Sequence, residues 1–165
     1  MPPRVLLAYY SMSGHTRDLA RELRTALGAE VEEIREPRLR RGAGGIWRAT
    51  VDAVLRREPP IVAPALDPSG YDLVAIGGPV WVGRMASPLR SYAHRLAGRA
   101  PRLAFFCTQG GRGAEQAFAD LGRLCGRAPD ATLVVDARHL RPEQHRESLQ
   151  RFVRALRAPV AGADR

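Results

Sequence analysis

Short apolar blocks and amphipathic stretches alternate along this chain. Four of the blocks show no alternation of polar and apolar positions, which is typical of strands that are buried on both faces of a parallel sheet. These blocks are Val5–Tyr10, Leu73–Ile76, Leu103–Cys107 and Thr132–Val135. A fifth block, Val31–Ile34, carries charges in its middle, and we therefore expect it at an edge of the sheet.

Between these blocks, apolar residues recur every three or four positions, which is the spacing of one face of a helix. Such stripes begin at Leu19, Ile46, Leu89, Ala114 and Leu149. Strands and helices that alternate in this way form parallel sheets through right-handed crossovers. The pattern therefore predicts an α/β fold, a three-layer sandwich around a five-stranded parallel sheet.

The length of the chain, 165 residues, suits one domain with a substantial core. We expect this domain over residues 1–158 and a loose tail over residues 159–165. No apolar run reaches the roughly 20 residues of a membrane helix, so no membrane partner is expected. Two cysteines, Cys107 and Cys125, are too few for a disulfide framework or a metal cluster. We therefore predict a cytoplasmic protein with free thiols and without a bound metal.

The formal net charge is +9, and all 26 basic residues are arginine. Nucleic-acid binding requires basic residues that gather on one face, whereas these arginines are spread along the chain. Only residues 36–45 are locally dense in arginine. The absence of lysine and asparagine indicates a bias in coding, and we do not expect a nucleic-acid partner.

Three loops follow the first, third and fourth predicted strands, and all three are rich in glycine and small polar residues. They read "SMSGHT" (11–16), "GGPVWVGRMASP" (77–88) and "TQGGRG" (108–113). Ligands of open parallel sheets bind beyond the carboxyl ends of the strands, where these loops should meet. The sequence thus predicts a binding site formed by these three loops.

The first loop ends where a helix begins, so backbone N–H groups and hydroxyls there could hold a phosphate. The alternative is an ordinary helix cap, with Ser13 or Thr16 as the capping residue. The loop lacks the lysine of a Walker P-loop and the spacing of a dinucleotide-binding motif. In the second loop, Trp81 offers a large flat face to a ring, and the third loop offers polar groups to the edge of that ring.

Taken together, these segments resemble the flavodoxin family. "SMSGHT" looks like the family's phosphate loop, "YDLVAIGGPVWVGRMASP" (71–88) is similar to its third strand and ring loop, and "LAFFCTQGG" (103–111) resembles its fourth strand and second ring loop. The resemblance implies the strand order 2-1-3-4-5 and a non-covalently bound FMN. The phosphate would lie on Ser11, Met12, Ser13, Gly14, His15 and Thr16. The isoalloxazine ring would lie against Pro79, Val80, Trp81, Val82, Gly83, Thr108, Gln109, Gly110 and Gly111.

The chain departs from the family at two points. Electron-carrying flavodoxins are typically acidic around the flavin, whereas Arg84 and Arg112 follow the ring loops here. Cations near the ring favour an anionic reduced flavin, so we predict a less negative midpoint potential than in a low-potential carrier. The third loop also lacks the tyrosine that covers the flavin in many flavodoxins, which leaves one ring face open.

We therefore expect an FMN-binding redox protein that transfers electrons, without a catalytic residue of its own. The alternatives are an NAD(P)H-dependent FMN quinone reductase and a non-catalytic binding module of the same fold. The corresponding partners are a redox partner protein, or NAD(P)H together with a small acceptor. The sequence leaves the oligomeric state open.

Overall fold

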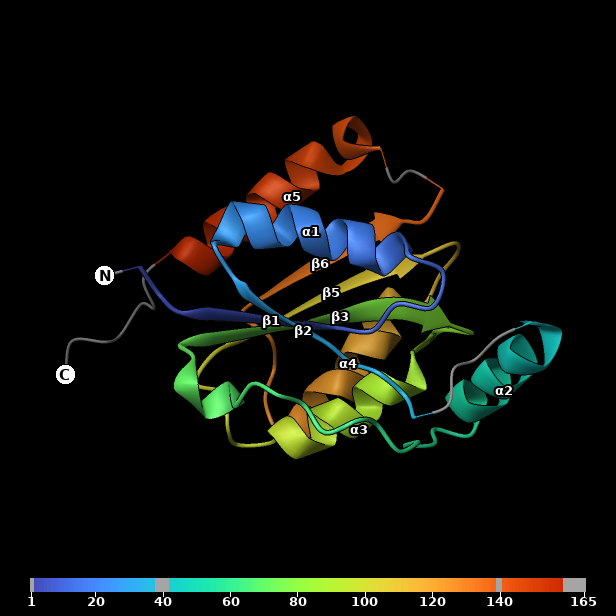
Figure 1. Ribbon diagram of the computed structural model, residues 1–165. Coiled ribbons are helices and arrows are strands. Elements are labelled where there is room, and N and C mark those ends of the chain that lie inside the picture. Colours follow the sequence, from blue (N-terminus) through green and yellow to red (C-terminus); the bar gives the residue numbers. More distant parts are fainter. Residues whose placement is uncertain (1, 38–41, 139–140, 159–165) are drawn as a thin grey trace.

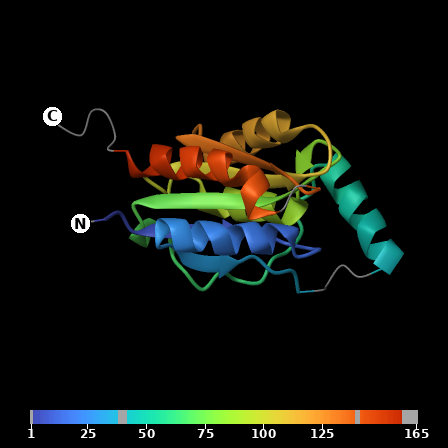
Figure 2. The same ribbon diagram turned by 90° about the horizontal axis from the view of Figure 1, so that it is seen from above.

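The computed structural model describes residues 2–37, 42–138 and 141–158. The chain forms a central sheet with helices on both faces (Figures 1 and 2). Its elements are β1 (Val5–Tyr9), α1 (His15–Leu27), β2 (Glu30–Glu33), α2 (Gly42–Val54), the 3-10 helix η1 (Pro68–Gly70), β3 (Leu73–Trp81), β4 (Arg84–Met85), α3 (Ser87–Leu96), β5 (Leu103–Gln109), α4 (Ala114–Cys125), β6 (Ala131–Asp136) and α5 (Pro142–Arg157). The predicted tail and part of the arginine-dense stretch lie outside the described residues.

The parallel strands lie in the order β2-β1-β3-β5-β6. This is the predicted order 2-1-3-4-5, because β5 and β6 are the fourth and fifth parallel strands along the chain. The prediction of the fold is therefore confirmed. A sixth strand was not predicted: the two-residue β4 folds back on the end of β3, with Val80 opposite Met85.

Alternate residues of the strands face two separate cores. In β1, Leu6 and Ala8 lie in the core beneath α3 and α4, while Val5 and Leu7 lie in the core beneath α1 and α5. Figure 1 shows these two helix pairs on opposite sides of the sheet. All residues of β1 are buried, which explains why the sequence showed no polar alternation there.

Two consecutive glycines let β3 pass between its neighbours near the carboxyl end of the sheet. A Cβ atom on Gly77 would lie 2.3 Å from the ring of Phe106. A Cβ atom on Gly78 would lie 2.2 Å from Cδ1 of Leu89 in α3. Both distances are shorter than real side-chain contacts, so only glycine allows β3 to continue into the loop that follows it.

Helix α2 lies beyond the carboxyl end of the sheet, apart from the two helix layers (Figures 1 and 2). Of the predicted stripe of Ile46, Ala49, Ala53 and Val54, the two alanines are buried, whereas Ile46 and Val54 are largely exposed. None of the helices in the described ranges has the length and apolar character of a membrane span.

Candidate cofactor-binding site

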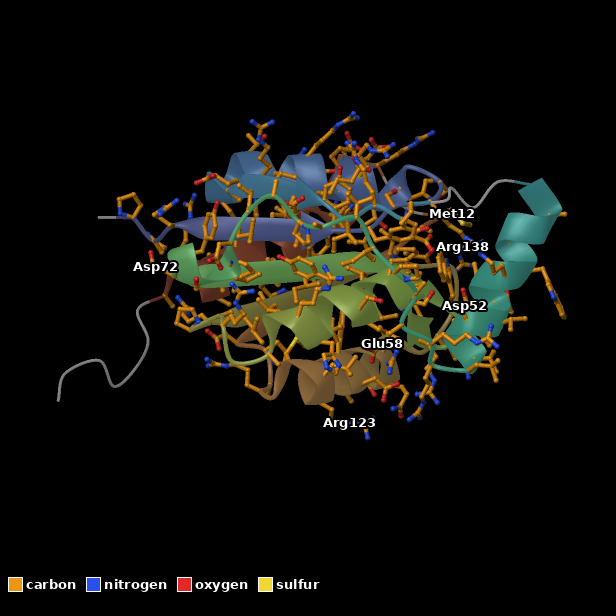
Figure 3. All side chains as sticks on the ribbon, turned by 60° about the horizontal axis from the view of Figure 1, so that its bottom comes forward. Met12, Asp52, Glu58, Asp72, Arg123 and Arg138 are labelled. Atoms are coloured by element: carbon orange, nitrogen blue, oxygen red, sulfur yellow. The ribbon has the colours of Figure 1, made fainter. Side chains whose placement is uncertain are left out.

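Three loops meet at the carboxyl end of the sheet, as predicted from the order of the elements. They lie at the carboxyl ends of β1, β3 and β5 and include the last residues of β3 and β5; we call residues 11–16, 79–83 and 108–113 together the three-loop site. In Figure 3, Met12 of the first loop lies at the same end of the molecule as α2. One side-chain or backbone contact connects each pair of loops, so the three form one surface.

A hydrogen bond between two threonines connects the first loop to the third. The Oγ1 atoms of Thr16 and Thr108 lie 2.9 Å apart, and both residues are almost fully buried. The Thr16 hydroxyl thus lies against Thr108 instead of pointing into solvent. It fixes the first turn of α1 to the end of β5.

The N-terminus of α1 has a glycine cap. Gly14 is the N-cap residue and has a φ of +99°, a region that glycine adopts without strain. The alternative prediction of an ordinary cap by Ser13 or Thr16 is therefore wrong. Instead, Oγ of Ser11 accepts hydrogen bonds from the backbone N–H groups of Gly14 (3.1 Å) and Arg17 (3.3 Å). Amides at this end of a helix carry partial positive charge, so the same groups can bind an anion.

The second loop is a tight hairpin between β3 and β4. Its two turn residues, Val82 and Gly83, have φ values of +49° and +70°, which is the requirement of a type I′ turn. A β-branched residue with positive φ is a genuine outlier and stores about 1–3 kcal/mol of strain. Val82 is also 65% exposed. The tip of the hairpin is therefore strained and presents an apolar side chain to solvent.

An aromatic contact connects the second loop to the first. The rings of Trp81 and Tyr10 meet edge to face, with centroids 5.8 Å apart and an interplanar angle of 88°. The hydroxyl of Tyr10 in turn donates to Oε2 of Glu36 at 3.0 Å. Because this contact orients the half-buried indole ring, Trp81 is held at the edge of the core instead of being folded into it.

Two glycines form the contact between the second and third loops. A Cβ atom on Gly113 would lie only 2.3 Å from the Cα atom of Gly83. Gly113 is also the N-cap residue of α4, with a φ of +109°. The sequence placed Gly113 in the third predicted loop but did not indicate its contact with Gly83. Its position in a glycine-rich loop was the available signal, but the approach of the two backbones is a tertiary feature.

The third loop contributes a buried amide oxygen. Oε1 of Gln109 is buried, and it accepts no hydrogen bond within the described part of the chain. The backbone carbonyl of Gln109, by contrast, accepts from the N–H of Ala137 at 2.8 Å. An unpaired buried acceptor costs about 1–3 kcal/mol. The side chain is thus suited to a ligand that donates a hydrogen bond, beside the exposed Gly110 and Gly111.

The structure corrects the expected role of Arg84. Its guanidinium group does not lie free beside the loops but donates Nη1–H to Oδ2 of the buried Asp120 in α4. Arg123 and Gln116 bind the other carboxylate oxygen. Burial raises the pKa of Asp120, but hydrogen bonding and the charge of Arg84 outweigh it, and the pKa is lower than usual. Asp120 thus pairs with two arginines, Arg84 and Arg123, and offsets only part of the charge of Arg84.

The lowered pKa of Asp120 predicts a dependence of stability on pH. A carboxylate with a lower pKa in the folded state stabilises the protein above its unfolded pKa of about 3.9, and this contribution is lost as the pH falls below that value. We expect Asp120→Asn to lower the free energy of unfolding at pH 7 by about 2 kcal/mol, because the ion pairs are lost. Urea unfolding at pH 7 and pH 3.5 tests this: the variant should lose less stability between the two values than the parent. An equal loss in both proteins would contradict the assignment.

Neither a reactive cysteine nor a bound metal ion is supported by the arrangement of the described residues. Cys107 at the end of β5 is completely buried, and this burial raises the pKa of its thiol to about 12. A reactive thiolate at neutral pH is thereby excluded. Across residues 2–37, 42–138 and 141–158, no group of three side chains is arranged to hold a metal ion.

Comparisons with known proteins agree with this arrangement. A flavoprotein from Lactobacillus acidophilus, solved in complex with FMN, superposes with a TM-score of 0.73 at 21% identity, covering 91% of this chain and 98% of its own. A candidate flavoprotein from Bacteroides uniformis gives a TM-score of 0.77 at 19% identity and coverages of 93% and 99%. For the two-electron reduced flavodoxin of Megasphaera elsdenii, the TM-score is 0.51 at 19% identity, with coverages of 91% and 98%.

At these identities, the structural similarities show the fold alone. The comparison with curated proteins found no match. The sequence itself matches the family model described as Flavodoxin over residues 4–156, nearly its whole length. The chain therefore belongs to the flavodoxin family.

Proposed function

We propose that this protein binds FMN non-covalently in the three-loop site and uses it to transfer electrons. The observation that carries the proposal is the meeting of an anion-binding helix end with a tryptophan and a buried unpaired amide at one end of the sheet. These groups suit the phosphate, the ring faces and the ring edge of one ligand. FMN, when bound, supplies the electron chemistry, while the protein sets its potential.

The first loop fits a phosphate group. Ser11 accepts hydrogen bonds from two amides at the start of α1, and a phosphate oxygen can take the place of that hydroxyl. Ser13 and His15 are exposed beside these amides. No acidic residue stands in the loop between Tyr10 and Arg17. Because hydrogen bonds to a charged group contribute about 1.5–3 kcal/mol each, a few of them retain the ligand firmly.

The second and third loops fit a heteroaromatic ring. The half-buried indole of Trp81 is oriented by Tyr10 and offers a flat apolar surface. The side-chain oxygen of Gln109 accepts no hydrogen bond from any described residue, and a ring N–H group would supply a donor. The flavoprotein from Lactobacillus acidophilus was solved in complex with FMN, which supports the same ligand here.

An absorbance titration tests the proposal. The purified protein is titrated with FMN, and NADH or NADPH is then added without oxygen. We expect saturable binding, with flavin bands that persist until dithionite is added, as in a carrier that receives electrons from another protein. A protein that binds no FMN would contradict the proposal and would favour a non-catalytic binding module of the same fold.

A second candidate function is an NAD(P)H-dependent FMN reductase for quinone-like acceptors. The observation that favours it is the exposed, glycine-rich third loop, where Gly110 and Gly111 carry no side chain that could cover a ring. A reduced nicotinamide could then approach that face. Rapid bleaching of the flavin bands by NADH or NADPH would identify this activity and would replace the carrier role.

Two finer expectations remain predictions. Because Asp120 holds Arg84 and offsets part of its charge, the less negative potential now depends mainly on Arg112, which is exposed and has no ion pair among the described residues. An exposed charge contributes at most about 1 kcal/mol, which corresponds to about 20 mV for a two-electron couple. The cytoplasmic location is supported by two buried cysteines, Cys107 and Cys125, that form no disulfide.

A further inference from the structure

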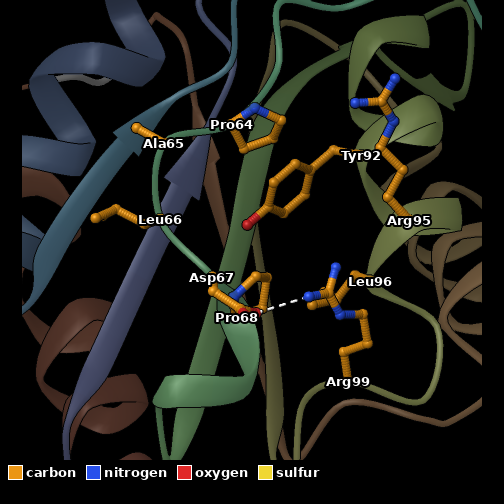
Figure 4. Close-up of a pocket in the computed structure, with 9 residues that line it drawn as sticks. All are labelled: Pro64, Ala65, Leu66, Asp67, Pro68, Tyr92, Arg95, Leu96 and Arg99. Carbon is orange, nitrogen blue, oxygen red and sulfur yellow. Dashed lines mark hydrogen bonds and ion pairs between the residues drawn. The ribbon is translucent and has the colours of Figure 1, made fainter.

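A second pocket lies away from the three-loop site, between the C-terminal half of α3 and the segment that leads into η1. Its volume is about 450 Å³, which is within the usual range for small-molecule sites. One wall consists of Tyr92, Arg95, Leu96 and Arg99, and residues 64–68 form the other (Figure 4). The spacing of three and four residues places Tyr92, Arg95 and Leu96 on one face of α3, and Arg99 follows the end of this helix.

The wall opposite α3 is rigid. Pro64 and Pro68 restrict its backbone. Oε2 of Glu32 accepts the backbone N–H groups of Ala65 (2.9 Å) and Leu66 (2.8 Å). A salt bridge of 2.8 Å between Asp67 and Arg99 closes one side of the pocket, as the dashed line in Figure 4 shows. Since this wall is held in place, a ligand would not have to order it.

A buried hydroxyl at the back of this pocket has no hydrogen-bond partner among the described residues. Tyr92 is 2% exposed, and its hydroxyl forms no hydrogen bond among the described residues. In Figure 4 this hydroxyl points from α3 toward the segment of residues 64–68. Burial raises the pKa of Tyr92 well above its usual value. The group therefore remains a neutral hydrogen-bond donor, and a buried donor without an acceptor is costly.

Arg95 supplies an available positive charge. It is exposed and, unlike Arg99, makes no ion pair with another described residue. Besides the ion pair of Asp67 and Arg99, the pocket is lined by apolar residues such as Pro64, Leu66 and Leu96. The pocket thus combines one cation without an ion pair among the described residues, one ion pair, one buried donor and an apolar surface.

We propose that this pocket is a second binding site, for a small monocarboxylate with an apolar or aromatic body. The carboxylate accepts the hydrogen bond of the Tyr92 hydroxyl, and the exposed side chain of Arg95, which points away from this hydroxyl in Figure 4, turns to pair with the carboxylate. The apolar body lies against Leu66 and Leu96. A carboxylate suits the pocket better than a neutral ligand because it uses both the unpaired cation and the unpaired donor.

Benzoate is a suitable probe for an NMR titration of the ¹⁵N-labelled protein loaded with FMN. We expect saturable shifts of the amide signals of residues 65–67 and 92–99, with a Kd of about 1 mM, as is usual for so small a ligand. Benzyl alcohol, which has nearly the same body but no charge, should bind at least about fivefold more weakly. The same titration works on the protein without FMN, so its outcome is independent of the proposed function.

Two variants and a matched control complete the test. Tyr92→Phe should weaken benzoate binding at least about fivefold because the donor is lost, and Arg95→Gln at least about threefold because the cation is lost. Arg24→Gln, which removes an exposed arginine on α1, should change nothing. Three results would each overturn the proposal. The first is that no saturable shifts occur at benzoate concentrations up to 20 times the expected Kd, the second is that the shifts are confined to residues 11–16, and the third is that benzyl alcohol binds as tightly as benzoate. Since Arg95 is exposed, its variant retains the fold and decides the question even if Tyr92→Phe does not fold.

Discussion

Replacing Ser13 with aspartate is expected to weaken FMN binding at least about a hundredfold and to leave riboflavin binding almost unchanged. Ser13 is exposed and precedes Gly14, the N-cap residue of α1. A carboxylate about 5 Å from one phosphate charge costs about 3 kcal/mol at the effective dielectric constant of a protein surface. Riboflavin has the same ring but no phosphate, so it escapes this repulsion.

The same substitution should not destabilise the protein without ligand. A negative charge at a helix N-terminus is favourable by about 0.3–1 kcal/mol, so urea unfolding of the ligand-free variant should show equal or slightly higher stability. Thr25→Asp places the same charge on the exposed side of the last turn of α1, and it should leave FMN affinity unchanged. Calorimetric or fluorescence titrations measure the two affinities. An equal loss for FMN and riboflavin would show that the first loop does not hold the phosphate.

The sheet was predictable because strands that are buried on both faces have a recognisable sequence. Strands covered by helices on both faces contain few polar residues, as the fully buried β1 shows. The loops between strands and helices could then be assigned to one end of the sheet from connectivity alone. For this reason the sequence indicated which three loops lie together at this end of the sheet before any geometry was known.

The contacts that join the loops were not predictable in the same way. Thr16 and Thr108 are 92 residues apart, and neither residue type reveals its partner. The hairpin at Val82 was missed because valine is disfavoured at positive φ, so its sequence gives no turn signal. Arg84 was expected beside the ligand because it directly follows the predicted ring loop. In the structure it binds the buried carboxylate of Asp120, which is 36 residues away in the sequence. Local patterns identify elements, whereas these pairings depend on how the elements pack.

The close approach of Gly113 to Gly83 predicts that a larger residue at position 113 strongly destabilises the protein. We expect Gly113→Ala to lower the free energy of unfolding by about 3–4 kcal/mol. The new Cβ atom would lie 2.3 Å from the Cα atom of Gly83, and the clash is with backbone, which cannot rotate away. The φ of +109° adds about 1–3 kcal/mol of strain for any residue other than glycine. Urea unfolding measures the loss, which is a large part of the stability of an ordinary domain.

Gly126→Ala separates the two contributions. Gly126 ends α4 with a φ of +76°, and a Cβ atom there would meet nothing within 4 Å. Alanine at this position is therefore destabilising by about 1 kcal/mol because of the positive φ, but it makes no steric clash. If the contact between the loops shapes the site, Gly113→Ala lowers FMN affinity beyond its effect on stability, whereas Gly126→Ala leaves the affinity unchanged. Equal losses of stability in both variants would mean that the backbones can separate, and the glycine contact would then not define the distance between the second and third loops.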